Sequence, residues 1–181
     1  ITEIETIQFE WTHRRGDVPK ISEIPYASAV IIRTDAGVTG EYVGGWPIDF
    51  AGIEFVAHLL LGHNALDRSG AYERCKHTTR QSGRVGHSVL DTALWDLAGK
   101  AFHRPVYELL GACRRPLRAY ASTAIGDVSG TGLHTPEAYA DFAEQCRAIG
   151  YQAFKIHGWA NGDVRREIAA ARAVADRVGG Q

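Results

Sequence analysis

The sequence predicts an α+β domain followed by the start of a parallel βα fold. Apolar residues recur with a period of two over much of residues 4–43, which is typical of half-buried strands. The apolar period then changes to 3.6, which is typical of amphipathic helices. From residue 117 onward short strands alternate with helices, and this order favours a parallel sheet. We therefore expect two domains, at residues 1–115 and 116–181.

The first domain opens with three predicted strands that form an antiparallel meander. Apolar residues alternate with other residues in the first strand, and a short Asp-Ala-Gly turn joins the second strand to the third. The strands are expected at residues 4–11, 26–33 and 38–43. Residues 12–25 are polar and contain glycine and proline, so they are predicted to form a long loop between the first two strands.

Helices are predicted after the third strand. Apolar residues at helical spacing form one face over residues 50–60, and a shorter helix is indicated at 71–75. The strongest pattern covers residues 85–102, where every fourth residue is apolar and a second row of apolar residues widens the stripe. Pro105 prevents this helix from continuing. Strands followed by helices make the first domain α+β.

The second domain is predicted to contain two βα units, with strands at 117–122 and 153–157. Thr135 followed by Pro136 is typical of a helix start, because threonine caps the first turn and proline suits its first position. Asp163 is expected to cap the second helix in the same way. The apolar faces expected on these helices are Ala138, Phe142, Cys146 and Ile149 on the first, and Val164, Ile168, Ala171, Ala175 and Val178 on the second.

The chain is expected to be part of a longer protein. It contains no methionine and begins at Ile1. The pattern ends where a third strand would begin, and two parallel strands alone leave both sheet edges uncovered. We therefore expect the remaining strands of the second domain to lie outside this sequence.

Composition excludes several classes of function. The chain has 181 residues, a formal net charge of -1 and 45% hydrophobic residues, so we expect neither a nucleic-acid partner nor an anionic membrane surface. It has no apolar run near the roughly 20 residues of a membrane helix. Its three cysteines lie far apart, which argues against a disulfide framework or a zinc knuckle and favours a reduced, cytoplasmic setting.

The clearest chemical signal is the strand segment Phe154-Lys155-Ile156-His157. Side chains two residues apart share one face of a strand, so the apolar pair and the basic pair are expected on opposite faces. If the apolar pair faces the helices, Lys155 and His157 lie together near the carboxyl end of the strand. Such a pair needs partners when buried, and an anionic ligand would supply them. The alternative is an edge strand with both side chains in water.

One long stretch resembles a known family. Residues 88–100, SVLDTALWDLAGK, and residues 105–111, PVYELLG, closely resemble a signature of the enolase superfamily, in the branch of mandelate racemase and muconate lactonizing enzyme. The surrounding order of elements is similar over essentially the whole chain. The resemblance implies an N-terminal α+β capping domain at 1–115 and the first two βα units of a modified TIM barrel at 116–181, with the active site between cap and barrel.

The resemblance also implies a chemistry. Members abstract the proton α to a carboxylate and stabilise the enolate on Mg²⁺. By analogy, Lys155 contacts the substrate carboxylate and His157 is the general base, where the family pattern has a second lysine. The alternative is that His157 only binds substrate. The carboxylates that bind the metal in this family lie on later barrel strands, so no metal ligand is expected within this sequence.

Two irregular segments, residues 12–25 and 44–49, fall where the specificity loops of the family lie, so the resemblance implies that they bind the substrate. The candidates are His13, Arg14, Arg15 and Lys20 in the first segment and Trp46 in the second. Basic and polar residues favour a polyhydroxylated acid, although a solvated basic loop is the alternative. Asp91 and Asp96 lie among core residues of a predicted helix, so we expect structural roles for them.

The function predicted from the sequence is that of a Mg²⁺-dependent lyase, a sugar-acid (aldonate or aldarate) dehydratase acting on a small carboxylate. One alternative is a racemase or epimerase of a 2-hydroxy acid, which needs a base on each face of the substrate. An alternative of another class is a non-catalytic βα binding domain, which predicts exposed Lys155 and His157. We also expect a homo-oligomer.

Overall fold

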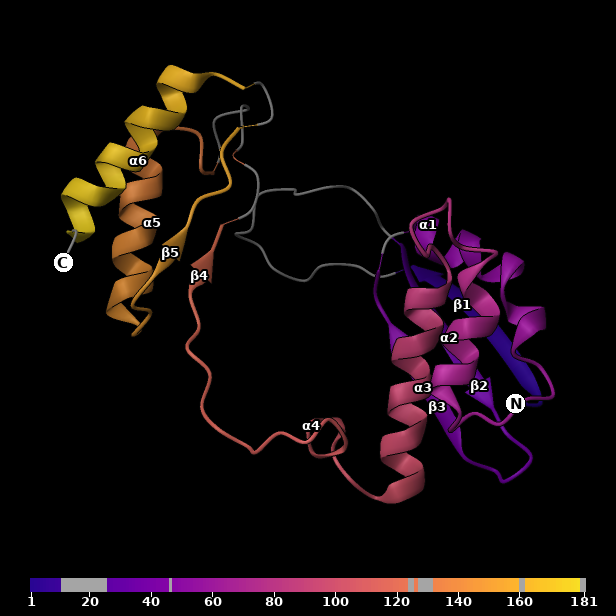
Figure 1. The fold of residues 1–181 in the computed structure, drawn as a ribbon. Helices are drawn as coiled ribbons and strands as arrows, with labels where there is room; N and C mark the ends of the chain where they lie inside the picture. The colour runs from indigo at the N-terminus through magenta and orange to yellow at the C-terminus, as the bar shows by residue number, and fades with distance from the viewer. Residues whose placement is uncertain (11–25, 46, 124–125, 127–131, 160–161, 180–181) are drawn as a thin grey trace. The chain divides into compact units, whose positions relative to one another are not determined.

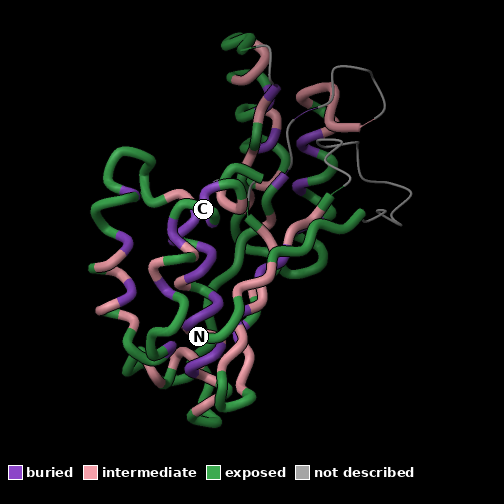
Figure 2. Tube along the Cα trace, turned by 90° about the vertical axis from the view of Figure 1, so that its right-hand side faces the viewer, coloured by how far each residue is buried: buried purple, intermediate pink, exposed green. Residues whose placement is uncertain are grey.

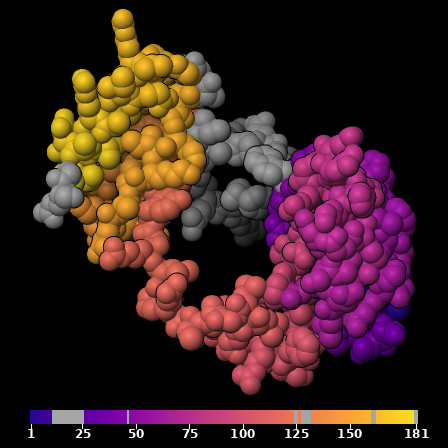
Figure 3. Space-filling view, viewed as in Figure 1, coloured from indigo at the N-terminus to yellow at the C-terminus, as the bar shows by residue number. Residues whose placement is uncertain are grey.

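The computed structural model describes residues 1–10, 26–45, 47–123, 126, 132–159 and 162–179. The chain divides between Arg115 and Pro116 into two compact units. We call the described residues up to Arg115 the first unit and those from Pro116 the second unit. Figure 1 shows their elements, and Figure 3 shows the packed atoms of each unit in the colours of the chain.

The first unit is built on a three-stranded antiparallel sheet with the order β1-β2-β3. β1 covers Glu3–Glu10, β2 covers Tyr26–Arg33 and β3 covers Thr39–Val43. In the register, Val30 of β2 lies opposite Thr6 of β1 and Tyr42 of β3. The predicted meander is therefore confirmed, and the predicted limits of β2 agree with the structure. The loop predicted over 12–25 lies outside the described residues.

The helices of the first unit follow β3 in the chain. They are α1 (Pro47–Ala51), α2 (Arg68–Lys76), α3 (His87–Phe102) and α4 (Val106–Leu109), with 3-10 turns at Gly52–Phe55 and Ala57–Leu59.

The single helical face predicted over 50–60 is thus divided among three short elements, although Ile53, Val56 and Leu60 are buried as expected. Part of the cause is the tight packing of Gly52. A Cβ atom at this position would lie 2.6 Å from Cγ1 of Val85. The chain at Gly52 therefore passes very close to Val85, and residues 52–55 form a 3-10 turn instead of continuing a regular helix.

The core of the first unit lies between α3 and the sheet. Val30 and Ile32 of β2 and Leu90, Leu94 and Leu97 of α3 are all at most 2% exposed. They belong to one apolar cluster, and Figure 2 shows the buried residues along the chain in purple. The apolar stripe predicted for residues 85–102 is therefore confirmed as the stripe that covers the sheet.

The second unit contains two short parallel strands and two helices. β4 (Ala121–Ser122) pairs with β5 (Phe154–Lys155), and α5 (Pro136–Ala148) and α6 (Val164–Val178) lie side by side. Both strands are shorter than predicted. Both predicted caps are confirmed, since Thr135 Oγ1 accepts a hydrogen bond from Ala138 N (3.1 Å) and Asp163 Oδ1 accepts from Arg165 N (3.1 Å).

The apolar faces predicted for α5 and α6 are largely wrong. Phe142, Ile149, Val164 and Ile168 are exposed; Cys146 is buried as predicted, but the other buried residues of the helices, most of them small, were not predicted. The two helices pack closely against each other, and small side chains allow that approach. The buried residues are Tyr139, Ala140, Ala143 and Cys146 on α5 and Ala170 and Val174 on α6.

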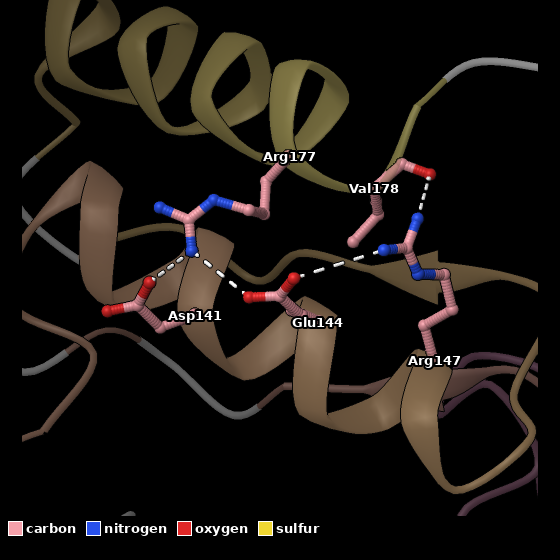
Figure 4. Close-up of polar contacts among 5 residues, drawn as sticks. All are labelled: Asp141, Glu144, Arg147, Arg177 and Val178. Atoms are coloured by element: carbon pink, nitrogen blue, oxygen red, sulfur yellow. Dashed lines mark hydrogen bonds and ion pairs between the residues drawn. The ribbon is translucent and has the colours of Figure 1, made fainter.

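Surface ion pairs also join α5 to α6 (Figure 4). Arg177 of α6 donates hydrogen bonds to Asp141 (2.5 Å) and Glu144 (3.3 Å) of α5. These carboxylates raise the pKa of the Arg177 guanidinium, the hydrogen bond to Asp141 being the largest cause. In the other direction, Arg147 of α5 donates to the carbonyl oxygen of Val178 (3.0 Å). Polar contacts thus cross the helix pair from both sides.

Two predictions about class can be compared with the structure. None of the helices within the described ranges is long and apolar enough to span a membrane. All three cysteines are free, with Cys75 and Cys146 buried and Cys113 exposed, so the prediction that they form no disulfide framework is confirmed.

Candidate active site

The candidate site lies at the carboxyl end of β5. Phe154 and Ile156 pack against the apolar cluster of the second unit, and the Phe154 ring lies edge-on to Phe142 of α5, with centroids 6.0 Å apart. Lys155 and His157 are exposed. The strand therefore separates an apolar face, which packs on the helices, from a basic pair, as the alternation of residues predicted.

Thr123 connects the end of β4 to the backbone and side chain of His157. Its backbone N–H donates to Lys155 O (3.0 Å), and its hydroxyl oxygen accepts from His157 N (2.8 Å). Its carbonyl oxygen lies 2.6 Å from Nδ1 of the His157 imidazole. Thr123 is only 5% exposed, so these contacts are shielded from water. The imidazole is thereby oriented from the neighbouring strand.

Tyr139 holds the same residue from the helix side. The hydroxyl of this buried α5 residue donates a hydrogen bond to His157 O (2.6 Å). Burial, followed by the negative charge of Glu167, raises the pKa of the Tyr139 hydroxyl, which keeps it protonated as a donor. The backbone of His157 is therefore held at its N–H by Thr123 and at its C=O by Tyr139.

The turn after His157 is held by Trp159. This buried residue donates its backbone N–H to Glu167 Oε1 (2.6 Å), and its ring meets Tyr139 edge-on at 5.1 Å. The guanidinium of Arg166 lies over the Trp159 ring, 4.0 Å from its centroid. Tyr139, Trp159 and the start of α6 thus form a support beneath the carboxyl end of β5.

These supporting residues are not evident in the sequence. Thr123 and His157 are 34 positions apart, and neither belongs to a spaced motif. Thr123 directly follows the predicted strand 117–122, and Trp159 follows 153–157 by two residues, so a search at strand ends would have found both. Nothing in the pattern of α5 distinguishes Tyr139, which was not among the residues predicted to form its apolar face.

The predicted substrate-binding residues His13, Arg14, Arg15, Lys20 and Trp46 lie outside the described residues. Asp96 has the structural role that was predicted for it. Its Oδ2 atom accepts from Glu41 N of β3 (2.8 Å) and lies 2.7 Å from Lys100 Nζ. It therefore ties α3 to the sheet edge.

No group of three or more histidine, cysteine, aspartate or glutamate side chains suited to a metal ion occurs in the described part of the chain. The residues present thus do not form a magnesium site.

The chain belongs to the family of mandelate racemase and muconate lactonizing enzyme. Residues 18–111 match the description "Mandelate racemase / muconate lactonizing enzyme, N-terminal domain". This finding confirms the resemblance seen in residues 88–100 and 105–111.

Solved and curated relatives support the same conclusion. The crystal structure of D-glucarate dehydratase from Agrobacterium tumefaciens, complexed with magnesium, superposes with a TM-score of 0.84 at 31% identity, covering 99% of this chain and 51% of that one. The predicted fold class, an α+β capping domain followed by the start of a TIM-type barrel, is thereby confirmed.

Two curated relatives show the range of activities. D-gluconate dehydratase from Thermoproteus tenax is 34% identical over 51% of this chain and 19% of its own length. N-succinyl-L-Arg/Lys racemase from Bacillus cereus is 26% identical over 91% of this chain and 42% of its own length. The chain therefore spans about half or less of the length of these relatives.

Proposed function

We propose that this chain is part of a Mg²⁺-dependent sugar-acid dehydratase that removes the proton α to a carboxylate. Two observations support the proposal. Lys155 and His157 are exposed at the carboxyl end of β5, which is the end where barrel enzymes carry their active sites. Relatives of the chain include D-glucarate and D-gluconate dehydratases. In this proposal residues 1–115 form the capping domain and 116–181 the first two βα units.

In the proposed reaction His157 accepts the α-proton and the electron pair of that C–H bond forms a C=C bond. The β-hydroxyl leaves with a proton as water, and the enol product converts to a 2-keto acid. The α-proton of a carboxylate is weakly acidic, so the developing negative charge on the carboxylate oxygens needs cations nearby. Lys155 supplies one positive charge, binding the carboxylate before proton transfer and more strongly during it.

Magnesium is part of the proposal because the D-glucarate dehydratase neighbour was crystallised with it. When bound, the ion stabilises negative charge on the substrate carboxylate as a Lewis acid. We propose that its ligands lie outside the described residues.

The basic residues His13, Arg14, Arg15 and Lys20, together with Trp46, are proposed to contact the hydroxylated part of the substrate. Cytoplasmic location, a homo-oligomeric state and the absence of nucleic-acid and membrane partners stay predictions.

Racemisation is a second candidate because one relative is an N-succinyl-L-Arg/Lys racemase. A racemase also removes the α-proton but returns it to the opposite face, and no water is lost. A non-catalytic βα binding domain is a third, because exposed Lys155 and His157 are what that alternative predicts. Such a domain would exchange no substrate proton with solvent.

The test uses the full-length protein with Mg²⁺ and a panel of D-gluconate, D-xylonate and D-glucarate in D₂O. Formation of a 2-keto-3-deoxy acid supports dehydration, whereas α-deuterium with inverted configuration and no loss of water supports racemisation. We expect His157→Asn to lower kcat by about 10²- to 10⁴-fold with little change in KM, because a general base acts only in the transition state.

The asparagine variant has a built-in structural control, because its amide N–H can take the place of Nδ1, which lies 2.6 Å from the Thr123 carbonyl oxygen, and should preserve that contact. The matched variant Lys155→Gln is expected to raise KM and lower kcat together. Full α-proton exchange in His157→Asn would contradict the assignment of His157 as the base.

A further inference from the structure

The short contact between His157 and Thr123 determines where the imidazole carries its proton. Nδ1 lies 2.6 Å from the Thr123 carbonyl oxygen, and a carbonyl oxygen can only accept a hydrogen bond. The contact is a hydrogen bond only if Nδ1 carries a hydrogen. In a neutral imidazole the other nitrogen, Nε2, is then unprotonated and basic.

The surroundings of Nε2 are consistent with this assignment. Among the described residues Nε2 has no hydrogen-bond partner, and the side chain is exposed on the strand that also carries Lys155. A basic nitrogen is therefore open to a ligand, while the opposite ring atom is anchored to the protein. This division between one anchored and one open nitrogen suits a histidine that accepts protons.

We propose that Thr123 is a positioning residue that fixes His157 as the Nδ1–H tautomer, so that Nε2 is the atom that takes the substrate α-proton. The inference rests on the proposed function and deepens it, because it assigns the acting atom and the residue that presents it. Thr123 itself does not touch the reacting atoms and is not a catalytic residue in this proposal.

The side chain of Thr123 is essential to the argument because the carbonyl contact alone leaves the His157 backbone free to move. The hydroxyl oxygen accepts from His157 N at 2.8 Å, and Thr123 N donates to Lys155 O at 3.0 Å. Tyr139 holds the His157 carbonyl oxygen from the other side at 2.6 Å. Together these three contacts to the backbone hold the imidazole ring within hydrogen-bonding distance of the Thr123 carbonyl oxygen.

The first test measures the tautomer without any substitution in the wild-type protein. The full-length protein is labelled with ¹⁵N-histidine, and the His157 signals are assigned by their loss in His157→Asn. Long-range ¹H–¹⁵N spectra are recorded about two pH units above the ordinary histidine pKa of about 6.5. We expect Nδ1 to be protonated and Nε2 to be unprotonated; a dominant Nε2–H tautomer would overturn the proposal.

The second test compares Thr123→Val with Thr123→Ser in the same full-length protein. Valine keeps the shape of threonine and removes the acceptor for His157 N, whereas serine keeps the acceptor. With the sugar acid of the panel that the wild type converts fastest, we expect Thr123→Val to lower kcat by about 10- to 100-fold, as for a misplaced catalytic group. We expect KM to stay nearly constant in both variants, and kcat to be close to wild type in Thr123→Ser.

A purely structural role for Thr123 predicts a different result. It would lower the melting temperature of Thr123→Val but leave the tautomer ratio of His157 and the kcat of the folded enzyme unchanged, and that outcome overturns the proposal. Failure of the underlying function is distinguishable, because it appears as undiminished α-proton exchange in His157→Asn. In that case the assignment of Nε2 as the reacting atom is overturned as well, even if the Nδ1–H tautomer is observed.

Discussion

The two units bury different kinds of apolar residue, although both also expose large apolar side chains. In the first unit Val30 and Ile32 of β2 and the leucines of α3 are buried, and α3 packs against β2 and β3. In the second unit the buried cluster consists of Tyr139, Trp159 and mostly small side chains, while several large aliphatic residues remain exposed. These exposed residues are Leu117, Ile149, Val164 and Ile168.

The residues proposed for catalysis, Lys155 and His157, lie in the second unit. His157 is held mainly by directed contacts, through Thr123, Tyr139 and the turn at Trp159. The first unit depends instead on the burial of apolar area, which is not directional. Substitutions are therefore expected to act on stability in the first unit and on orientation in the second.

The largest expected effect is on the core of the first unit. Leu94→Ala should lower the free energy of unfolding by about 2–5 kcal/mol, because Leu94 is fully buried and the truncation leaves a cavity. Native-state hydrogen exchange of the full-length protein, read on peptides from β2 and α3, would measure the loss.

The matched variant in the second unit is Ile149→Ala. This residue is 76% exposed in residues 1–181, so we expect a change within about 0.5 kcal/mol when the 181-residue chain is unfolded. Equal losses of unfolding free energy in Leu94→Ala and Ile149→Ala would contradict the expected difference between the buried and the exposed position.

The same comparison explains which parts of the fold could be predicted from the sequence. The stripe on α3 was predicted correctly because one broad apolar face meets one sheet. On α6 the pattern selected Val164 and Ile168, which are exposed, whereas Ala170 and Val174 are buried against α5. Periodicity identifies residues that favour burial, but it does not identify the neighbour that covers them.

The candidate site was predictable only in part, for a similar reason. Alternation along the strand was enough to separate Lys155 and His157 from the apolar pair. Thr123 could have been found as the residue after a predicted strand, but Tyr139 was not predictable, because it contacts His157 through a single hydroxyl group from another element. Hydrogen bonds between distant residues have no sequence period.

A smaller loss of stability is expected when alanine replaces a glycine that lies in close contact with another element. A Cβ at Gly40 of β3 would overlap the carbonyl oxygen of Ala93 and lie 2.6 Å from the Leu97 Cβ on α3. Backbone cannot move aside easily, so Gly40→Ala should cost about 1–3 kcal/mol of stability. Thermal unfolding of the full-length variant would measure this cost.

The corresponding glycine in the second unit is Gly158. A Cβ there meets the carboxylate end of Glu167, which is a flexible side chain. We expect Gly158→Ala to cost about the net value of one hydrogen bond, near 1 kcal/mol, as Glu167 releases Trp159 N. A larger loss of stability in Gly158→Ala than in Gly40→Ala would contradict the expectation that the backbone contact at Gly40 is the less tolerant of the two.

The smallest expected effect concerns a histidine whose environment is the opposite of that of His157. His87, at the start of α3, is 7% exposed, and its buried Nε2 atom has no hydrogen-bond partner among the residues that the structure describes. Its ring meets Tyr72 edge-on at 5.8 Å. Burial lowers the pKa of His87; Asp91 opposes this shift and Arg84 adds to it.

The sign of the pH dependence follows from that direction. Below the ordinary histidine pKa of about 6.5, the unfolded chain binds a proton that folded His87 does not bind until lower pH. Stability present above that pKa is therefore lost as the pH falls toward the folded pKa. We expect urea unfolding at pH 7 and pH 5 to show a smaller loss in His87→Phe than in wild type, since phenylalanine keeps the ring contact with Tyr72 but cannot bind a proton. An identical loss in both proteins would show that His87 is not the residue that makes the first unit sensitive to acid.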